Sequence, residues 1–142
     1  MHSARTTAEV MTTIAEIRAA RRRAGGRMLG FVPTMAALHA GHVSLMERAR
    51  RECEVTVVSI FVNPAQFGPG EDFQRYPRSW EADLKACRGC GVDLIFAPTP
   101  EEMYPRPPLT RVTVESLSEG LCGRQRPGHF DGVALVVAKL LN

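Results

Sequence analysis

Residues 55–62 read Val55-Thr56-Val57-Val58-Ser59-Ile60-Phe61-Val62, an almost continuous run of β-branched side chains. Such a run is typical of a strand that is buried on both faces, as strands are in parallel sheets. Shorter apolar segments predict two more strands at residues 28–32 and 92–96, and residues 111–114 predict a weaker one. The sequence therefore indicates a sheet whose strands follow one another along the chain.

Helical segments alternate with these strands. Residues 6–24 predict a helix in which Thr6 and Glu9 form a capping box. Further helices are predicted from Gly41 to about Arg51, from the cap Ser79 as far as Gly91, from the cap Thr99, and from Gly132 to Leu141. The alternation predicts an α/β fold, a Rossmann-like doubly wound parallel sheet with flanking helices, in one domain over residues 1–142.

Composition narrows the class of protein. Since the sequence has no run of about 18 apolar residues and no secretory signal, we expect a cytoplasmic protein without a membrane span. The net charge is +3, and the densest basic run, at residues 21–23, has no aromatic neighbour. We interpret that run as a solvated helix end rather than a nucleic-acid surface. Cys87 and Cys90 lack a second pair of ligands, so we interpret them as structural cysteines.

The densest group of chemically useful residues is Pro33-Thr34-Met35-Ala36-Ala37-Leu38-His39-Ala40-Gly41-His42. It connects a predicted strand to a predicted helix, at the strand end where open α/β sheets bind ligands. Gly41 allows close approach of a ligand, and the helix N-terminus favours a phosphate. His39 and His42 can then contact a polyphosphate and stabilise charge as the α-phosphorus is attacked. The alternatives are ordinary surface histidines, or a metal site that lacks a clear third ligand nearby.

A second polar group follows the buried strand. Asn63 and Gln66 come directly after it, so we expect them beside the histidine loop. Gln66 offers two donors and an acceptor, which suits a hydroxy acid, whereas Asn-Pro alone is also a common turn. Residues 126–130, Arg-Pro-Gly-His-Phe, can line the pocket and hold an anion, or form a rigid loop with a helix cap.

Together these blocks resemble the pantothenate synthetase (pantoate–β-alanine ligase) family of H-x-G-H nucleotidylyltransferases. The resemblance is carried by residues 31–42, by residues 61–68 with Tyr76-Pro77-Arg78, and by residues 126–133, in the family's order and across nearly the whole chain. It implies that pantoate attacks ATP to give pantoyl adenylate and pyrophosphate. The β-alanine amine then displaces AMP to give pantothenate.

The resemblance also implies roles for single residues. The segment that binds ATP corresponds to Met35, Ala36, Ala37, Leu38, His39, Ala40, Gly41 and His42. Within it His42 is the proton donor and His39 contacts phosphate. Gln66 binds pantoate and β-alanine, and Asn63 and Met35 belong to the same pocket. ATP chemistry implies Mg²⁺, for which Asp83 is a candidate ligand or, alternatively, an ordinary acid of a first helical turn. Family members are homodimers, and we expect the same here.

The sequence departs from the family at several places. Ala36 stands where glycine is usual, and Cys122 stands where some members carry glutamate. The family's later lysine block, its serine-serine-arginine phosphate loop and its small C-terminal domain have no counterpart. We therefore expect a fragment or shortened form that binds nucleotide weakly and turns over little. Two other functions stay open: a nucleotidylyltransferase for another small acceptor, and a non-catalytic ATP-binding or assembly module.

Overall fold

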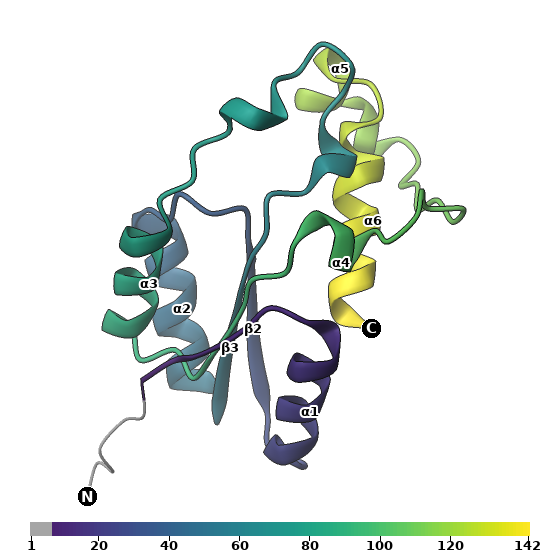
Figure 1. Ribbon diagram of the computed structural model, residues 1–142. Helices are drawn as coiled ribbons and strands as arrows, with labels where there is room; N and C mark the ends of the chain where they lie inside the picture. The colour runs from purple at the N-terminus through teal and green to yellow at the C-terminus, as the bar shows by residue number, and fades with distance from the viewer. Residues whose placement is uncertain (1–6) are drawn as a thin grey trace, which may run out of the picture.

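Four parallel strands form the centre of the computed structural model, which describes residues 7–142 (Figure 1). They are ordered β1-β4-β3-β2 across the sheet, and comprise β1 (Glu9–Met11), β2 (Leu29–Thr34), β3 (Val55–Ile60) and β4 (Leu94–Phe96). The longest pairing joins β2 to β3, from Leu29 opposite Val55 to Thr34 opposite Ile60. The predicted parallel α/β sheet is confirmed.

Helices cover both faces of this sheet, as a doubly wound fold requires (Figure 1). The helices are α1 (Ile14–Ala24), α2 (Ala40–Glu52), α3 (Trp80–Gly89), α4 (Pro100–Met103), α5 (Cys122–Gln125) and α6 (His129–Leu141). Short 3₁₀ turns are η1 (Pro64–Gln66), η2 (Phe73–Arg75) and η3 (Leu117–Glu119). Side chains of α2 and α3 form one core cluster with the sheet, and side chains of α1, α4 and α6 form the other.

The central strand β3 explains why the two layers hold together. All six of its residues are buried. Val58 and Ile60 belong to the cluster with α2 and α3, whereas Val55 and Val57 belong to the opposite cluster. Each fully buried side chain of this kind contributes about 1.5–3 kcal/mol. The continuous β-branched run is therefore a strand with a core on each side, as the sequence predicts.

The predicted N-terminal helix over residues 6–24 is wrong in its first half. Thr6 lies outside the described residues, and Glu9–Met11 forms β1 beside β4. The T-x-x-E pattern occurs a second time, and this copy caps α1: the Glu16 N–H donates to Thr13 Oγ1 at 3.2 Å, and the Thr13 N–H donates to the Glu16 carboxylate at 2.9 Å. Pairing with the sheet edge therefore overrides the first helix signal.

Two further predictions differ from the structure. Residues 111–114 form no strand, because no neighbouring strand of the described chain pairs with them. The strand predicted at residues 28–32 instead continues through Pro33 to Thr34. Proline is compatible with this place because β2 is at the edge of the sheet and needs no N–H there for a second neighbour.

The basic run lies in an exposed helix end, as the sequence predicts, and Cys87 lies in the core. Residues 21–23 form the last turn of α1 and are exposed, and Arg23 pairs with Glu9 at 3.2 Å. Cys87 is buried without a disulfide, and burial raises the pKa of its thiol to about 11, which disfavours the reactive thiolate. In residues 7–142 no helix is long and apolar enough to cross a bilayer.

Candidate active site

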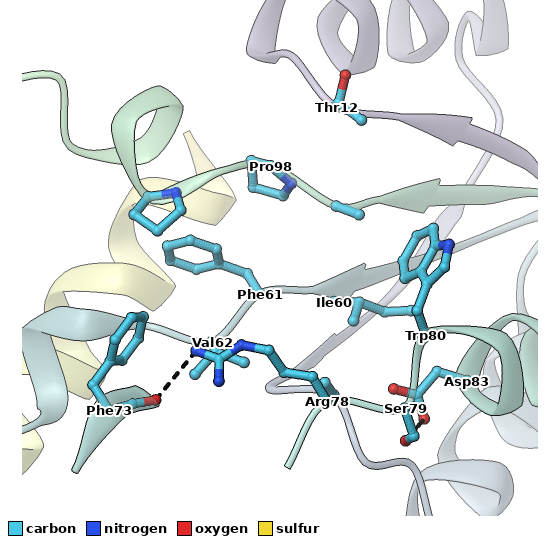
Figure 2. A pocket seen from close by; sticks show the side chains of 13 residues that line it. Thr12, Ile60, Phe61, Val62, Phe73, Arg78, Ser79, Trp80, Asp83 and Pro98 are labelled. Atoms are coloured by element: carbon cyan, nitrogen blue, oxygen red, sulfur yellow. Dashed lines mark hydrogen bonds between the residues drawn. The ribbon is translucent and has the colours of Figure 1, made fainter. Parts of the chain in front are cut away.

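A pocket of about 360 Å³ opens at the carboxyl ends of the parallel strands (Figure 2). Its lining combines residues that follow all four strands with the start of α3: Thr12, Ala36, Ile60, Phe61, Val62, Phe73, Arg78, Ser79, Trp80, Asp83, Ala97, Pro98 and Pro100. Figure 2 shows the apolar side chains that continue from β3, with Arg78, Ser79 and Asp83 along one edge. Parallel sheets bind ligands at this edge.

The two histidines meet at the N-terminus of α2. Their ring centroids are 4.1 Å apart. The Gly41 N–H donates to His39 Nδ1 at 3.1 Å, and the His39 N–H donates to His42 Nδ1 at 3.1 Å, so both rings cap the helix. Because each Nδ1 accepts a hydrogen bond, each neutral ring carries its proton on Nε2. The pair therefore offers two Nε2–H donors beside a helix N-terminus.

The protonation of His42 follows from its surroundings. Burial, and then the neighbouring His39, lowers the pKa of His42 below its usual value of 6.5. His42 is therefore neutral near pH 7, in the form that the cap requires. Gly41 makes the arrangement possible, because a Cβ at this position would lie 2.9 Å from His39 Cε1. The glycine lets the His39 ring fold back over the helix end.

The connection between β2 and α2 has an unusual backbone. Ala36 has φ 67° and Ala37 has φ 53°, both in the left-handed region. This region costs a residue with a Cβ about 1–2 kcal/mol. A positive φ at Ala36 is a conformation that glycine would adopt without strain. In this chain the loop is held in spite of two alanines, and Asp83 of α3 accepts the Ala37 and Leu38 N–H groups at 2.9 and 2.8 Å.

Asn63 and Gln66 lie together in the turn after β3, where the Asn63 side chain is bound by other residues of the chain. Asn63 is 0% exposed. Its Nδ2 donates to Gln66 Oε1 and to the Gly132 carbonyl, each at 3.0 Å, and its Oδ1 accepts from Ala65 N–H at 3.2 Å and from the Tyr104 hydroxyl at 2.8 Å. All four hydrogen-bonding positions of Asn63 are thus used within the chain.

Gln66 retains a donor. Its Oε1 is taken by Asn63, while its Nε2 makes no hydrogen bond within residues 7–142. The Gln66 carbonyl accepts from His129 Nδ1 at 2.9 Å. Arg126 pairs with Glu71 and also lies 3.5 Å from the same carbonyl. Arg126, followed by the Gly68 N–H, lowers the pKa of Glu71, so the pair stays ionised. Arg126 and His129 therefore fix the position of the Gln66 carbonyl.

The structure brings the predicted residues together in two groups. The predicted ATP segment occupies the β2–α2 connection and the first turn of α2, and the Asn63–Gln66 pair occupies the η1 turn after β3. Of these residues only Ala36 lines the described pocket. Sequence reasoning missed Thr12, Phe73 and Trp80, which line the pocket, and Tyr104, which donates to Asn63; none of them lies in a local motif. Arg78 had a signal in the Tyr-Pro-Arg block, and it donates to the Phe73, Gln74 and Tyr76 carbonyls.

Comparisons with known proteins identify the family of this chain. The sequence model of the pantoate-beta-alanine ligase family matches residues 9–142. A pantothenate synthetase of Pelotomaculum thermopropionicum is 56% identical over 135 residues, which are 94% of this chain and 48% of that protein.

Two solved structures are also similar. The pantothenate synthetase of Thermus thermophilus has a TM-score of 0.86 and 56% identity, over 93% of this chain and 47% of the other. The pantoate-beta-alanine ligase of Francisella tularensis, complexed with β-γ ATP and β-alanine, has a TM-score of 0.88 and 39% identity, over 94% and 52%. The chain thus spans about half the length of its relatives, and it belongs to the pantoate–β-alanine ligase family.

Proposed function

We propose that this chain supplies the ATP-binding domain for the ligation of pantoate and β-alanine. In the first step a carboxylate oxygen of pantoate attacks the α-phosphorus of ATP, and the bond to pyrophosphate breaks. In the second step the β-alanine nitrogen attacks the acyl carbon and AMP leaves. Support comes from membership of the family and from the β-γ ATP and β-alanine of the Francisella tularensis ligase.

The observation that carries the proposal is the pair of imidazoles at the N-terminus of α2. His39 and His42 use Nδ1 for the helix cap, so Nε2–H is the donor that each can offer to a phosphate oxygen. The helix end adds a partial positive charge in the same place. Negative charge develops on the phosphate oxygens during attack at phosphorus, and preorganised donors stabilise that charge. We assign proton donation to His42 and phosphate contact to His39.

Gln66 is the proposed contact for both carboxylic acid substrates. Its Nε2 amide can donate to a carboxylate or hydroxyl oxygen, since only its Oε1 is bound within the described chain. Asn63 contributes indirectly, because its fully satisfied amide orients Gln66 Oε1. Arg126 and His129 also contribute indirectly, because they contact the Gln66 backbone carbonyl. Met35 remains a proposed part of this pocket.

Mg²⁺ would reach the site on the phosphates of ATP. Residues 7–142 contain no cluster of three or more acidic, histidine or cysteine side chains that could hold a metal ion. Asp83, the candidate ligand, directs its two oxygens at backbone N–H groups. Magnesium commonly binds proteins through one or two carboxylates and substrate phosphates. The described residues therefore offer no cluster of three protein ligands for Mg²⁺, and we assign them no step through the ion.

A homodimer is the proposed assembly. Apolar side chains between α4 and α5 are strongly exposed, with Leu109 at 97%, Leu117 at 83% and Leu121 at 90%. An apolar surface of this kind favours burial against a protein partner. In analytical ultracentrifugation we expect a dimer that Leu117→Lys converts to a monomer. Leu45→Lys, at a leucine of α2 that is 53% exposed, serves as the control and should leave the dimer intact.

The catalytic proposal is tested by pantoate-dependent exchange of labelled pyrophosphate into ATP. We expect exchange to fall by about 10²–10³-fold in His42→Ala, as it does when a preorganised donor is lost. Glu47→Gln on the exposed side of α2 should leave the rate unchanged. Equal exchange in the wild type and His42→Ala would refute the role of His42. ATP binding without any exchange would instead favour the non-catalytic module.

The cytoplasmic location stays a prediction.

A further inference from the structure

Asp83 is a buried acid whose side-chain oxygens accept hydrogen bonds from two backbone N–H groups and one hydroxyl. It is 1% exposed and lies in the first half of α3. Oδ2 accepts the Ala37 N–H at 2.9 Å, Oδ1 accepts the Leu38 N–H at 2.8 Å, and the Ser79 hydroxyl donates to Oδ1 at 3.3 Å. Within residues 7–142 no lysine or arginine forms an ion pair with it. A buried carboxylate needs such donors, because desolvation otherwise opposes its charge.

The two N–H groups face the same carboxylate because of the strained loop. Ala36 and Ala37 both have positive φ, and the N–H groups of Ala37 and Leu38 each bind one oxygen of the Asp83 carboxyl group. Alanine does not favour positive φ, so the conformation must be held from outside the loop. The loop leads directly into His39 and the first turn of α2.

We propose that Asp83 is a positioning residue, which holds residues 36–38 in their left-handed conformation and thereby sets where His39 and His42 lie. This links α3 to Ala37, 46 residues away in the sequence, in the loop that leads into the histidine pair. The consequence for ATP rests on the proposed function, while the effect on the loop does not. Asp83 thus acts on the site through the backbone of residues 37 and 38.

The first test replaces Asp83 by Asn, which keeps the shape but exchanges one acceptor for an N–H₂ donor facing a backbone N–H. We expect hydrogen exchange at the Ala37 and Leu38 amides to accelerate by at least about tenfold, the equivalent of about 1.4 kcal/mol. Glu81→Gln removes the same charge from an exposed place on α3 and should change neither amide. Unchanged exchange in Asp83→Asn would overturn the proposal.

The second test asks whether the anion itself is needed. Asp83→Ala removes the carboxylate and leaves space for formate between the Ala37 and Leu38 N–H groups. We expect ATP affinity to fall by about tenfold or more in Asp83→Ala, and added formate to restore it. Formate should have no effect on the wild type or on Asp83→Asn, whose amide fills the space. A general loss of folding would not respond to formate, and circular dichroism with thermal unfolding checks that the variants remain folded.

These readouts separate the two proposals. If the wild type does not bind ATP, the proposed function fails, and the amide exchange still decides the role of Asp83. If the wild type binds ATP and Asp83→Ala binds it equally well, the positioning role is wrong although the nucleotide site stands. Lost ATP affinity that formate does not restore would also refute the role, because the loop would then depend on something other than the carboxylate.

Discussion

The two connections that leave the neighbouring strands β2 and β3 are built in opposite ways. After β2, the loop has two residues with positive φ, and its histidines are exposed or half-buried. After β3, Asn63 is fully buried and every polar atom of its side chain is bound. In the first connection the two histidine Nε2 atoms make no hydrogen bond within the described residues, whereas the second connection uses the whole Asn63 side chain to bind itself to the rest of the chain.

This difference shows what a motif residue can contribute. In the H-x-G-H segment the residues of the motif carry the donors themselves, and a distant carboxylate maintains the backbone. In the Asn-Pro-Ala-Gln segment the two polar residues differ in role. Asn63 uses its whole side chain for contacts within the chain, and only the Gln66 Nε2 amide remains as a donor. We therefore expect substitutions after β3 to act mainly on stability, and those in the β2–α2 loop to act on stability more weakly.

The largest effect is expected for Gly132→Ala. A Cβ on Gly132 would lie 2.5 Å from the Ala65 carbonyl carbon and 2.6 Å from Gln66 Cα, and backbone atoms cannot rotate away. We expect a loss of at least about 3 kcal/mol in the free energy of unfolding, measured with denaturant. Gly89→Ala is the matched control, since nothing lies within 4 Å of its Cβ, and it should be neutral or stabilising. Equal effects would mean that α6 does not pack closely on η1.

A smaller loss is expected for Asn63→Ala. The change leaves the Tyr104 hydroxyl and the Ala65 N–H without their Asn63 acceptor, and it removes the Asn63 Nδ2 bonds to Gln66 Oε1 and the Gly132 carbonyl, at a cost of about 2 kcal/mol. Tyr104→Phe removes one of these bonds and should cost about 1 kcal/mol. Burial raises the pKa of Tyr104 to about 12, so its hydroxyl is protonated and donates at neutral pH. Thermal or chemical unfolding measures the loss in the free energy of unfolding for each variant. Equal losses would contradict the view that Asn63 holds several groups together rather than Tyr104 alone.

In the loop after β2, Ala37→Gly should stabilise the fold. Glycine adopts positive φ without strain but loses more entropy on folding, which leaves a net gain of about 0.5 kcal/mol. Ala36→Gly should be close to neutral, because it also removes a buried methyl worth about 0.8 kcal/mol. Ala82→Gly, on the exposed side of α3, should lose about 1 kcal/mol. Chemical denaturation distinguishes the three, and a destabilising Ala37→Gly would show that the loop is not strained.

The smallest effect concerns the protonation of His42. Its pKa in the folded chain lies below the usual 6.5, so the unfolded chain binds the proton at a higher pH than the folded chain does. Stability should therefore decrease as the pH falls from 6.5 through the lower folded-state pKa. An NMR titration of the His42 Cε1 proton gives that pKa directly. His42→Asn keeps an acceptor for the His39 N–H and should lose this contribution, while a midpoint at or above 6.5 in the wild type would refute it.

Local pattern was sufficient for much of the fold and for part of the site. Residues 55–62 predicted a doubly buried strand, and the glycine and histidines of residues 39–42 predicted the start of a helix with polar groups at its end. The same reasoning was wrong for the first half of residues 6–24. The T-x-x-E pattern occurs at residues 6–9 and at residues 13–16, and either copy could begin a helix. Only the second does, because the segment that contains Glu9 pairs with β4. The reasoning was also wrong for residues 111–114, since a β-branched segment becomes a strand only beside another strand.

The sequence by itself determined the parallel sheet and the order of its helices and strands along the chain, and it predicted the residues that carry the chemistry. These features depend on side chains that are close along the chain, where periodicity and capping act. Only the tertiary structure decided that Asp83 supports the backbone of residues 37 and 38, and that Asn63 is bound by Tyr104 and by Gly132. The Asn63 contacts join residues 41 and 69 positions apart. Such pairs form because burial requires each polar group to find a partner, and the packing of the elements determines which partner is within reach.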